Sequence, residues 1–106
     1  MAATMPVRED AASSGGVETG ILHAGGGTLR WKIAGSTLYC SDFEGDRASY
    51  AALVDAANAI AVERFAAVLV TRVAEHDIGI EALRGAGFID DTESFDGHLT
   101  LVRDVR

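Results

Sequence analysis

Apolar and polar residues alternate strictly along residues 28–33, where Leu29, Trp31 and Ile33 fall on one side and hydroxyl or basic residues on the other. A period of two is typical of a strand with one face against a core and the other in water. Weaker strand patterns occupy Val17–Ala24 and residues 37–42, and glycine-containing turns separate the three segments. Short strands joined by tight turns predict an antiparallel meander.

A helical spacing follows the meander. Apolar residues recur every three to four positions from Tyr50 to Ala61, and either Asp46 or Ser49 can cap the start of this helix. The next segment, residues 66–73, is almost continuously apolar. Such a run predicts a strand that is covered on both faces.

The last third of the chain predicts a short helix and a hairpin. Asp77 is a suitable N-cap for a helix over residues 77–86, and Gly87 can end it. Two strands, at residues 88–95 and His98–Asp104, then form a hairpin around an Asp-Gly turn. The element order is β-β-β-α-β-α-β-β. This order predicts an α+β fold with a mixed, mostly antiparallel sheet and two helices.

Composition narrows the class of protein. Residues 1–16 show no periodicity and are rich in small and polar side chains, so we expect a disordered tail before a single domain at residues 17–106. No apolar run approaches the ~20 residues of a membrane span, and charges at residues 8–10 interrupt any leader-like stretch, so a cytoplasmic protein is expected. The net charge of −7 argues against nucleic acid or an anionic membrane as partner. A single cysteine and three histidines without ligand spacing predict neither a disulfide nor a metal site.

The segment from Ile80 to Phe88 reads Ile-Glu-Ala-Leu-Arg-Gly-Ala-Gly-Phe. With the element order, it resembles the GNAT acetyltransferase superfamily, whose members carry an Asn-x-x-Ala-x-x-Leu-Tyr-x-x-x-Gly-Phe helix before their last strands. The likeness runs from about residue 17 to the C-terminus and is similar to the degenerate first half of tandem-type amino-sugar acetyltransferases. It implies the family core without the first strand and the two helices that usually precede it.

The chain departs from this family at two functional positions. The family's acyl-CoA loop reads Gln/Arg-x-x-Gly-x-Gly/Ala, and Asp42, Gly45 and Arg47 stand at its three defined positions. Gly45 and Arg47 are therefore the candidate cofactor-binding residues, but the acids of the loop would repel a pyrophosphate, so no cofactor is expected and acetyl-CoA is disfavoured. The family's proton-donating tyrosine aligns with Leu83, which has no proton to donate, and its asparagine aligns with His76.

Three residues are the candidates for chemistry in the family cleft: His76, Asp42 and Cys40. Cys40 and Asp42 end the third predicted strand, beside which the resembled fold opens. A thiolate needs a nearby base or cation, whereas the neighbours of Cys40 are acids, so a small buried side chain is the alternative reading. His76 follows the apolar central strand, at the end of the sheet where ligands commonly bind. Its alternative role is that of a capping or solvent-exposed residue.

The resemblance supports several functions, and whether the chain is an enzyme is left open among them. The first is a small-molecule biosynthetic protein that uses the family cleft for acyltransferase-like or repurposed acid–base chemistry without standard acetyl-CoA transfer. The alternatives are a non-catalytic binding or scaffolding module of a larger acyltransferase assembly and an atypical acyl-CoA-dependent N-acyltransferase. Because the usual covering helices are missing, a sheet face is expected to be uncovered. We therefore expect a homodimer or a complex with a partner protein.

Overall fold

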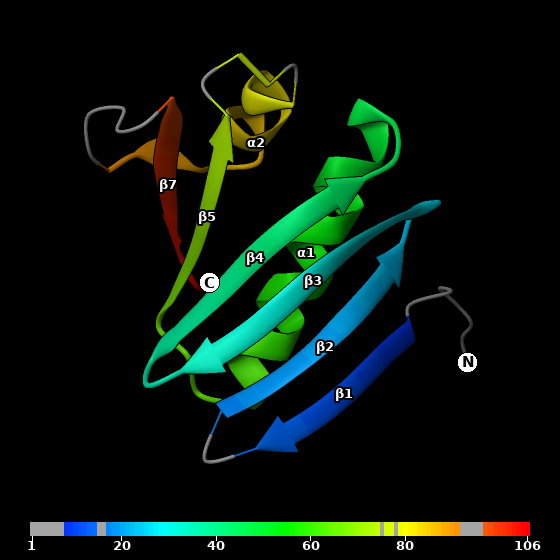
Figure 1. The fold of residues 1–106 in the computed structure, drawn as a ribbon, viewed down its shortest axis with the longest axis vertical. Coiled ribbons are helices and arrows are strands. Elements are labelled where there is room, and N and C mark those ends of the chain that lie inside the picture. Colours follow the sequence, from blue (N-terminus) through cyan, green and yellow to red (C-terminus); the bar gives the residue numbers. More distant parts are fainter. Residues whose placement is uncertain (1–7, 15–16, 75, 78, 92–96) are drawn as a thin grey trace.

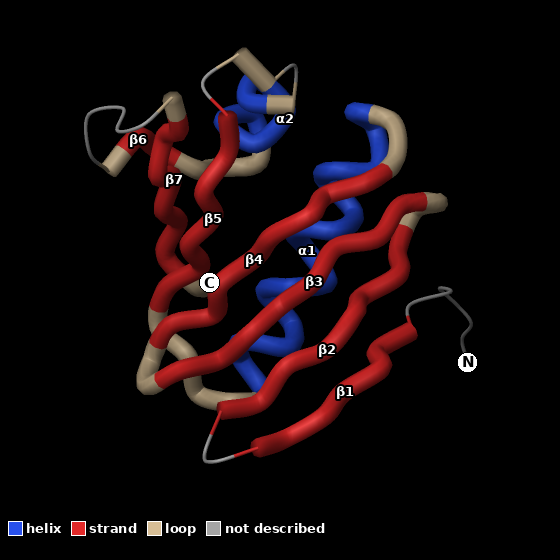
Figure 2. The backbone as a smooth tube through the Cα atoms, in the orientation of Figure 1, coloured by secondary structure: helices blue, strands red, loops and turns tan. Residues whose placement is uncertain are grey.

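The computed structural model describes the backbone of residues 8–14 and, with their side chains, residues 17–74, 76–77, 79–91 and 97–106. The elements are β1 (Arg8–Ser14), β2 (Val17–Ala24), β3 (Gly27–Ala34), β4 (Thr37–Glu44), α1 (Arg47–Glu63), β5 (Val68–Ala74), α2 (Ile80–Gly85), β6 (Ile89–Asp90) and β7 (His98–Asp104). Within these residues, the strands form one sheet in the order β1-β2-β3-β4-β5-β7-β6 (Figure 2). Every neighbouring pair is antiparallel except β4 and β5. The predicted α+β fold, with a mixed, mostly antiparallel sheet and two helices, is confirmed.

The predicted disordered tail is wrong for Arg8–Ser14, which form β1. This strand pairs with β2 along its whole length, from Arg8 opposite His23 to Ser14 opposite Val17. It lies at the edge of the sheet, where backbone hydrogen bonds to one neighbour are enough to hold a strand that has no apolar period. The rest of the predicted tail lies outside the described residues.

Helix α2 is shorter than predicted, whereas β7 has the predicted bounds. Asp77 does not cap α2 directly; its carboxylate accepts a hydrogen bond from the Gly79 backbone N–H at 2.6 Å, and α2 begins one residue later. Of the strand predicted over residues 88–95, only Ile89–Asp90 pair with β7 among the described residues, and residues 92–96 lie outside them. The turn that the Asp77 side chain closes occupies the residues that the sequence pattern assigned to the first turn of the helix.

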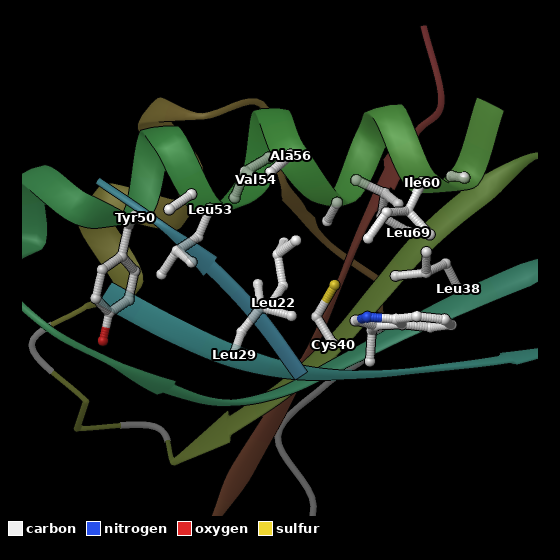
Figure 3. Close-up of a cluster of buried hydrophobic side chains, with 14 of the residues drawn as sticks. Leu22, Leu29, Leu38, Cys40, Tyr50, Leu53, Val54, Ala56, Ile60 and Leu69 are labelled. Atoms are coloured by element: carbon white, nitrogen blue, oxygen red, sulfur yellow. The ribbon is translucent and has the colours of Figure 1, made fainter. Parts of the chain in front are cut away.

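The core lies between one face of the sheet and α1. Figure 3 shows leucines from the strands pointing toward the helix, with Cys40 among them. Alanines at positions 57 and 61 of α1 are fully buried and let the helix approach the strands closely. Close approach also requires Gly27, because a Cβ there would lie 2.9 Å from the Ser49 Cβ on α1. Leu83 and Phe88 belong to the same core, so α2 packs on the same side of the sheet as α1.

The opposite face of the sheet carries no helix within the described residues. In Figure 1 the strands pass in front of α1, so this face is turned toward the viewer. We call it the open face. Its residues alternate with those of the core, as at Arg30 and Lys32 on β3 and Tyr39 on β4. The expected homodimer or partner complex stays a prediction.

Among the described residues, no helix combines the length and the apolar character that a membrane crossing requires.

Candidate functional site

The sheet opens between β4 and β5, where these two parallel strands separate (Figure 1). Their pairing runs from Thr37 opposite Val68 to Cys40 opposite Thr71, and the described residues beyond form no further pairs between them. Asp42 contributes to the separation, because it has a positive φ of 53° and lies where the register of β4 against β3 shifts. A bulge of this kind bends its strand, and aspartate tolerates the left-handed conformation better than most residues.

A cavity of about 200 Å³ lies in this opening, and we call it the strand cleft. Its walls come from the end of β4, the first turn of α1, the end of β5, the loop before α2 and the start of β7. The lining residues are Asp42, Phe43, Tyr50, Thr71, Arg72, Val73, Ala74, Asp77 and His98. Polar groups that converge from several elements on one concave site are typical of small-molecule binding.

Tyr50 supplies a phenol to the strand cleft. Its ring stacks on Phe43 with the ring centroids 5.1 Å apart, and a Cβ at Gly79 would come within 2.5 Å of that ring. Burial and the nearby Asp77 carboxylate both raise the pKa of Tyr50. The phenol therefore carries its proton at neutral pH, where it can donate that proton but cannot act as a base.

Thr71 adds a buried hydroxyl to the cleft. The residue is 2% exposed, and its Oγ1 has no hydrogen-bond partner among the described residues. Buried polar groups are nearly always paired, so an unpaired hydroxyl on a cavity wall is available to a ligand. Thr71 also borders the concavity on the open face.

The residues predicted from the sequence are divided between neighbouring sites. Asp42 lines the strand cleft and forms an ion pair with Arg30 at 3.4 Å between Oδ2 and Nε. His76 and Arg47 line a second depression of about 370 Å³ against α2, which shares Asp77 with the strand cleft. Arg47 and His76 thus share one depression, and Asp42 and Tyr50 share the strand cleft.

Gly45 precedes α1 and has a φ of +127°. A Cβ at this position would lie 2.9 Å from the Gly27 Cα and 3.2 Å from the Ser49 hydroxyl oxygen. That hydroxyl donates a hydrogen bond to the Gly25 carbonyl at 2.9 Å. The glycine is thus required for packing within the chain, whatever role it has toward a cofactor.

Cys40 is a core residue, which argues against its predicted role in the cleft. It is 4% exposed and belongs to the same buried cluster as the strand leucines (Figure 3). Burial raises the pKa of the Cys40 thiol to about 12, so the reactive thiolate is absent at neutral pH. The sequence placed Cys40 next to Asp42, but Cys40 points toward α1 while β4 turns at Asp42 into the cleft.

We expect Cys40 to resist Ellman's reagent in the folded protein, because the thiol is both protonated and enclosed. Less than about one tenth of the thiol should react within an hour at pH 8, and all of it in 6 M guanidinium chloride. Absorbance at 412 nm measures the reaction. Rapid labelling of the native chain would show that the thiol reaches the cleft.

The sequence did not indicate that two of the cleft residues, Tyr50 and Thr71, belong to a site. Tyr50 reads as one more apolar position of an amphipathic helix, and Thr71 as one polar residue in an apolar strand. Only the separation of β4 from β5 makes both into cavity walls. Leu83, at the family's tyrosine position, is fully buried in the core and offers the cleft no proton. Among the described residues, no group of His, Cys, Asp or Glu could hold a metal ion.

No protein-family model and no curated protein matches the sequence. Solved structures, in contrast, superpose over most of the chain. Nourseothricin acetyltransferase is 22% identical, with a TM-score of 0.66 over 85% of this chain and 66% of its own length. The chain has the GNAT acetyltransferase fold. The resemblance stated from the sequence is thereby confirmed at the level of fold.

Other GNAT structures agree in fold while differing widely in sequence. The ribosomal-protein-S18-alanine N-acetyltransferase of Escherichia coli is 13% identical, with a TM-score of 0.64 over 88% of this chain and 72% of that enzyme. The PaiA N-acetyltransferase of Thermoplasma acidophilum, solved in complex with coenzyme A, is 11% identical, with a TM-score of 0.64 over 83% and 60%. The chain thus spans 60–72% of the length of these GNAT proteins.

Proposed function

We propose that the chain binds a small molecule in the strand cleft and acts on it by acid–base chemistry, without standard transfer from acetyl-CoA. The observation that carries this proposal is a protonated phenol in the cleft, beside a loop that is lined with acids. Tyr50 is the proton donor in this reading, and Asp77 and His98 place a carboxylate and an imidazole on the same cavity. A role in small-molecule biosynthesis is the wider form of the same proposal.

The loop between β4 and α1 supports the part of the proposal that concerns acetyl-CoA. Glu44 and Asp46 are exposed, and Asp46 is the N-cap of α1 without a side-chain capping hydrogen bond. Their carboxylates lie beside the helix N-terminus, which would otherwise attract a pyrophosphate. Arg47 is a single counter-charge, and it borders the depression against α2.

An atypical acyl-CoA-dependent N-acyltransferase is the second candidate function. It is favoured by one observation: Tyr50 supplies a phenol to the cleft although Leu83 has replaced the family's tyrosine. A protonated phenol is suited to protonating a departing thiolate. The two candidates differ in whether the loop before α1 accepts the phosphates of a CoA thioester.

Acetyl-CoA titrated into the ¹⁵N-labelled protein tests the proposal. We expect the backbone amides from Gly45 to Ser49 to report a Kd above ~1 mM at physiological salt. The chemical shifts of these amides measure binding in the family's pose, separately from binding elsewhere. Micromolar binding that shifts these amides would overturn the first proposal and establish the second.

A further inference from the structure

The open face holds a concavity with a volume of about 950 Å³. It crosses β2, β3, β4, β5 and β7, and we call it the open-face concavity. Its charged side chains are Arg30, Lys32 and Arg72, and none of the described residues that line it is acidic. The whole chain has 9 Lys and Arg against 16 Asp and Glu. Among the described lining residues, the charged side chains are thus all basic, against the overall charge of the protein.

The sheet register brings these cations together. Arg30 lies opposite Ser41, and Lys32 lies opposite Tyr39 in the neighbouring row. Arg72 follows Thr71, the last residue of β5 that pairs with β4, so it occupies the position across the opening from Ser41. Arg30 and Arg72 thus lie on either side of Ser41 in one row across the open face, with Thr100 next along the row, and all four residues line the concavity.

The remainder of the concavity is suited to an apolar group. Ile21 and Val70 are partly buried on its floor, and the Tyr39 ring is 42% exposed. Lys32 Nζ lies 5.4 Å from the centroid of that ring, so the ring also orients one of the cations. Hydrophobic walls with a few directed polar groups are the usual makeup of a small-molecule site.

We propose that the open-face concavity binds an amphipathic small-molecule anion. The carboxylate or phosphate lies between the guanidinium groups of Arg30 and Arg72, and a ring or short chain lies on Ile21, Tyr39 and Val70. Planar guanidinium groups match the geometry of both anions. The site lies on the face of the sheet opposite α1 and does not depend on the function proposed for the strand cleft.

Asp42 acts as an internal competitor for this anion. Its carboxylate pairs with Arg30, and the two side chains are 63% and 64% exposed. Exposed ion pairs are weak, so an incoming anion can displace this carboxylate at little cost. Removing the charge of Asp42 should therefore tighten anion binding. Asparagine is the suitable replacement, because it tolerates the positive φ at this position.

The test uses 2-naphthoate, 2-naphthyl phosphate and the neutral 2-naphthamide as probes, titrated into the ¹⁵N-labelled full chain. At least one anion should bind with a Kd below ~1 mM, at least tenfold more tightly than 2-naphthamide. Its binding should shift the backbone amide signals of Lys32, Tyr39 and Ser41. Which anion binds more tightly distinguishes a carboxylate from a phosphate ligand. Higher salt should weaken the binding of both anions.

Variants locate the site. Arg30→Gln and Arg72→Gln should each weaken the anion at least fivefold, whereas Asp42→Asn should tighten it about threefold. Arg106→Gln, which removes an exposed charge on the side of α1, is the matched control and should leave the affinity unchanged. Equal binding of anion and amide, or unchanged affinity in both arginine variants, would refute the proposal. So would the absence of binding by either anion.

Discussion

Replacing Phe88 by alanine is expected to lower the free energy of unfolding by about 3–5 kcal/mol, the usual cost of removing a buried phenylalanine ring. Phe88 is 2% exposed and belongs to the main core. It follows Gly87, whose φ of +103° ends α2, and its backbone N–H donates to the Leu83 carbonyl at 3.1 Å. A helix of six residues is not stable alone, so α2 depends on this anchor.

A loss of this size is a large part of the roughly 5–15 kcal/mol that stabilises a domain of this length. Guanidinium chloride unfolding, followed by circular dichroism, measures it. Phe88→Leu is the control, because it keeps an apolar side chain in the site and should cost less than about 1.5 kcal/mol. Equal stability of the alanine variant and the native chain would show that the ring does not hold α2 on the core.

The double variant Glu44→Gln/Asp46→Asn is expected to bind acetyl-CoA at least tenfold more tightly than the native chain. The two substitutions remove two negative charges beside the N-terminus of α1, where the helix dipole favours an anion. Asparagine at position 46 remains a good N-cap, so the helix start should be preserved. Isothermal titration calorimetry at low and physiological salt measures the effect, which should shrink as salt screens the charges.

The control for this variant is Asp55→Asn/Glu63→Gln, which removes the same charge from exposed positions farther along α1. If the control tightens acetyl-CoA as much as the loop variant does, the effect comes from net charge alone. An unchanged affinity in the loop variant would mean that the acids do not decide the loss of the family's cofactor site. The departures at Asp42 and Arg47 would then be the remaining causes.

The sequence predicted the elements whose side chains face two different environments. The alternation at Leu29, Trp31 and Ile33 marks β3 because that strand has the core on one side and the open face on the other. The apolar run at residues 66–73 marks β5 as a strand, but the prediction that both of its faces are covered is wrong, because Val70 is only half-buried and Arg72 is exposed on the open face. β1 was not predicted, because an edge strand held by backbone hydrogen bonds does not need alternating apolar and polar side chains.

The candidate site was less predictable because it depends on the spacing between strands. Cys40 and Asp42 are close in sequence, yet one is enclosed under α1 and the other lies at the cleft. Tyr50 enters the cleft only because β4 bends at Asp42 and the loop before α2 brings Asp77 toward it. Likewise, the sequence pattern places Arg30 on the solvent-exposed side of its strand. That Arg30 and Arg72 lie in one row follows only from the parallel pairing of β4 with β5.

That pairing also has a mechanical consequence for the sheet. Among the described residues, β4 and β5 share four residue pairs, whereas β5 and β7 share seven. The join between β4 and β5 thus has fewer residue pairs than the joins on either side of it, to β3 and to β7. Thr71 and Arg72 lie at the end of this join and border both the strand cleft and the open-face concavity. Because the same two residues border both, any change in the position of the end of β5 alters the walls of both at once.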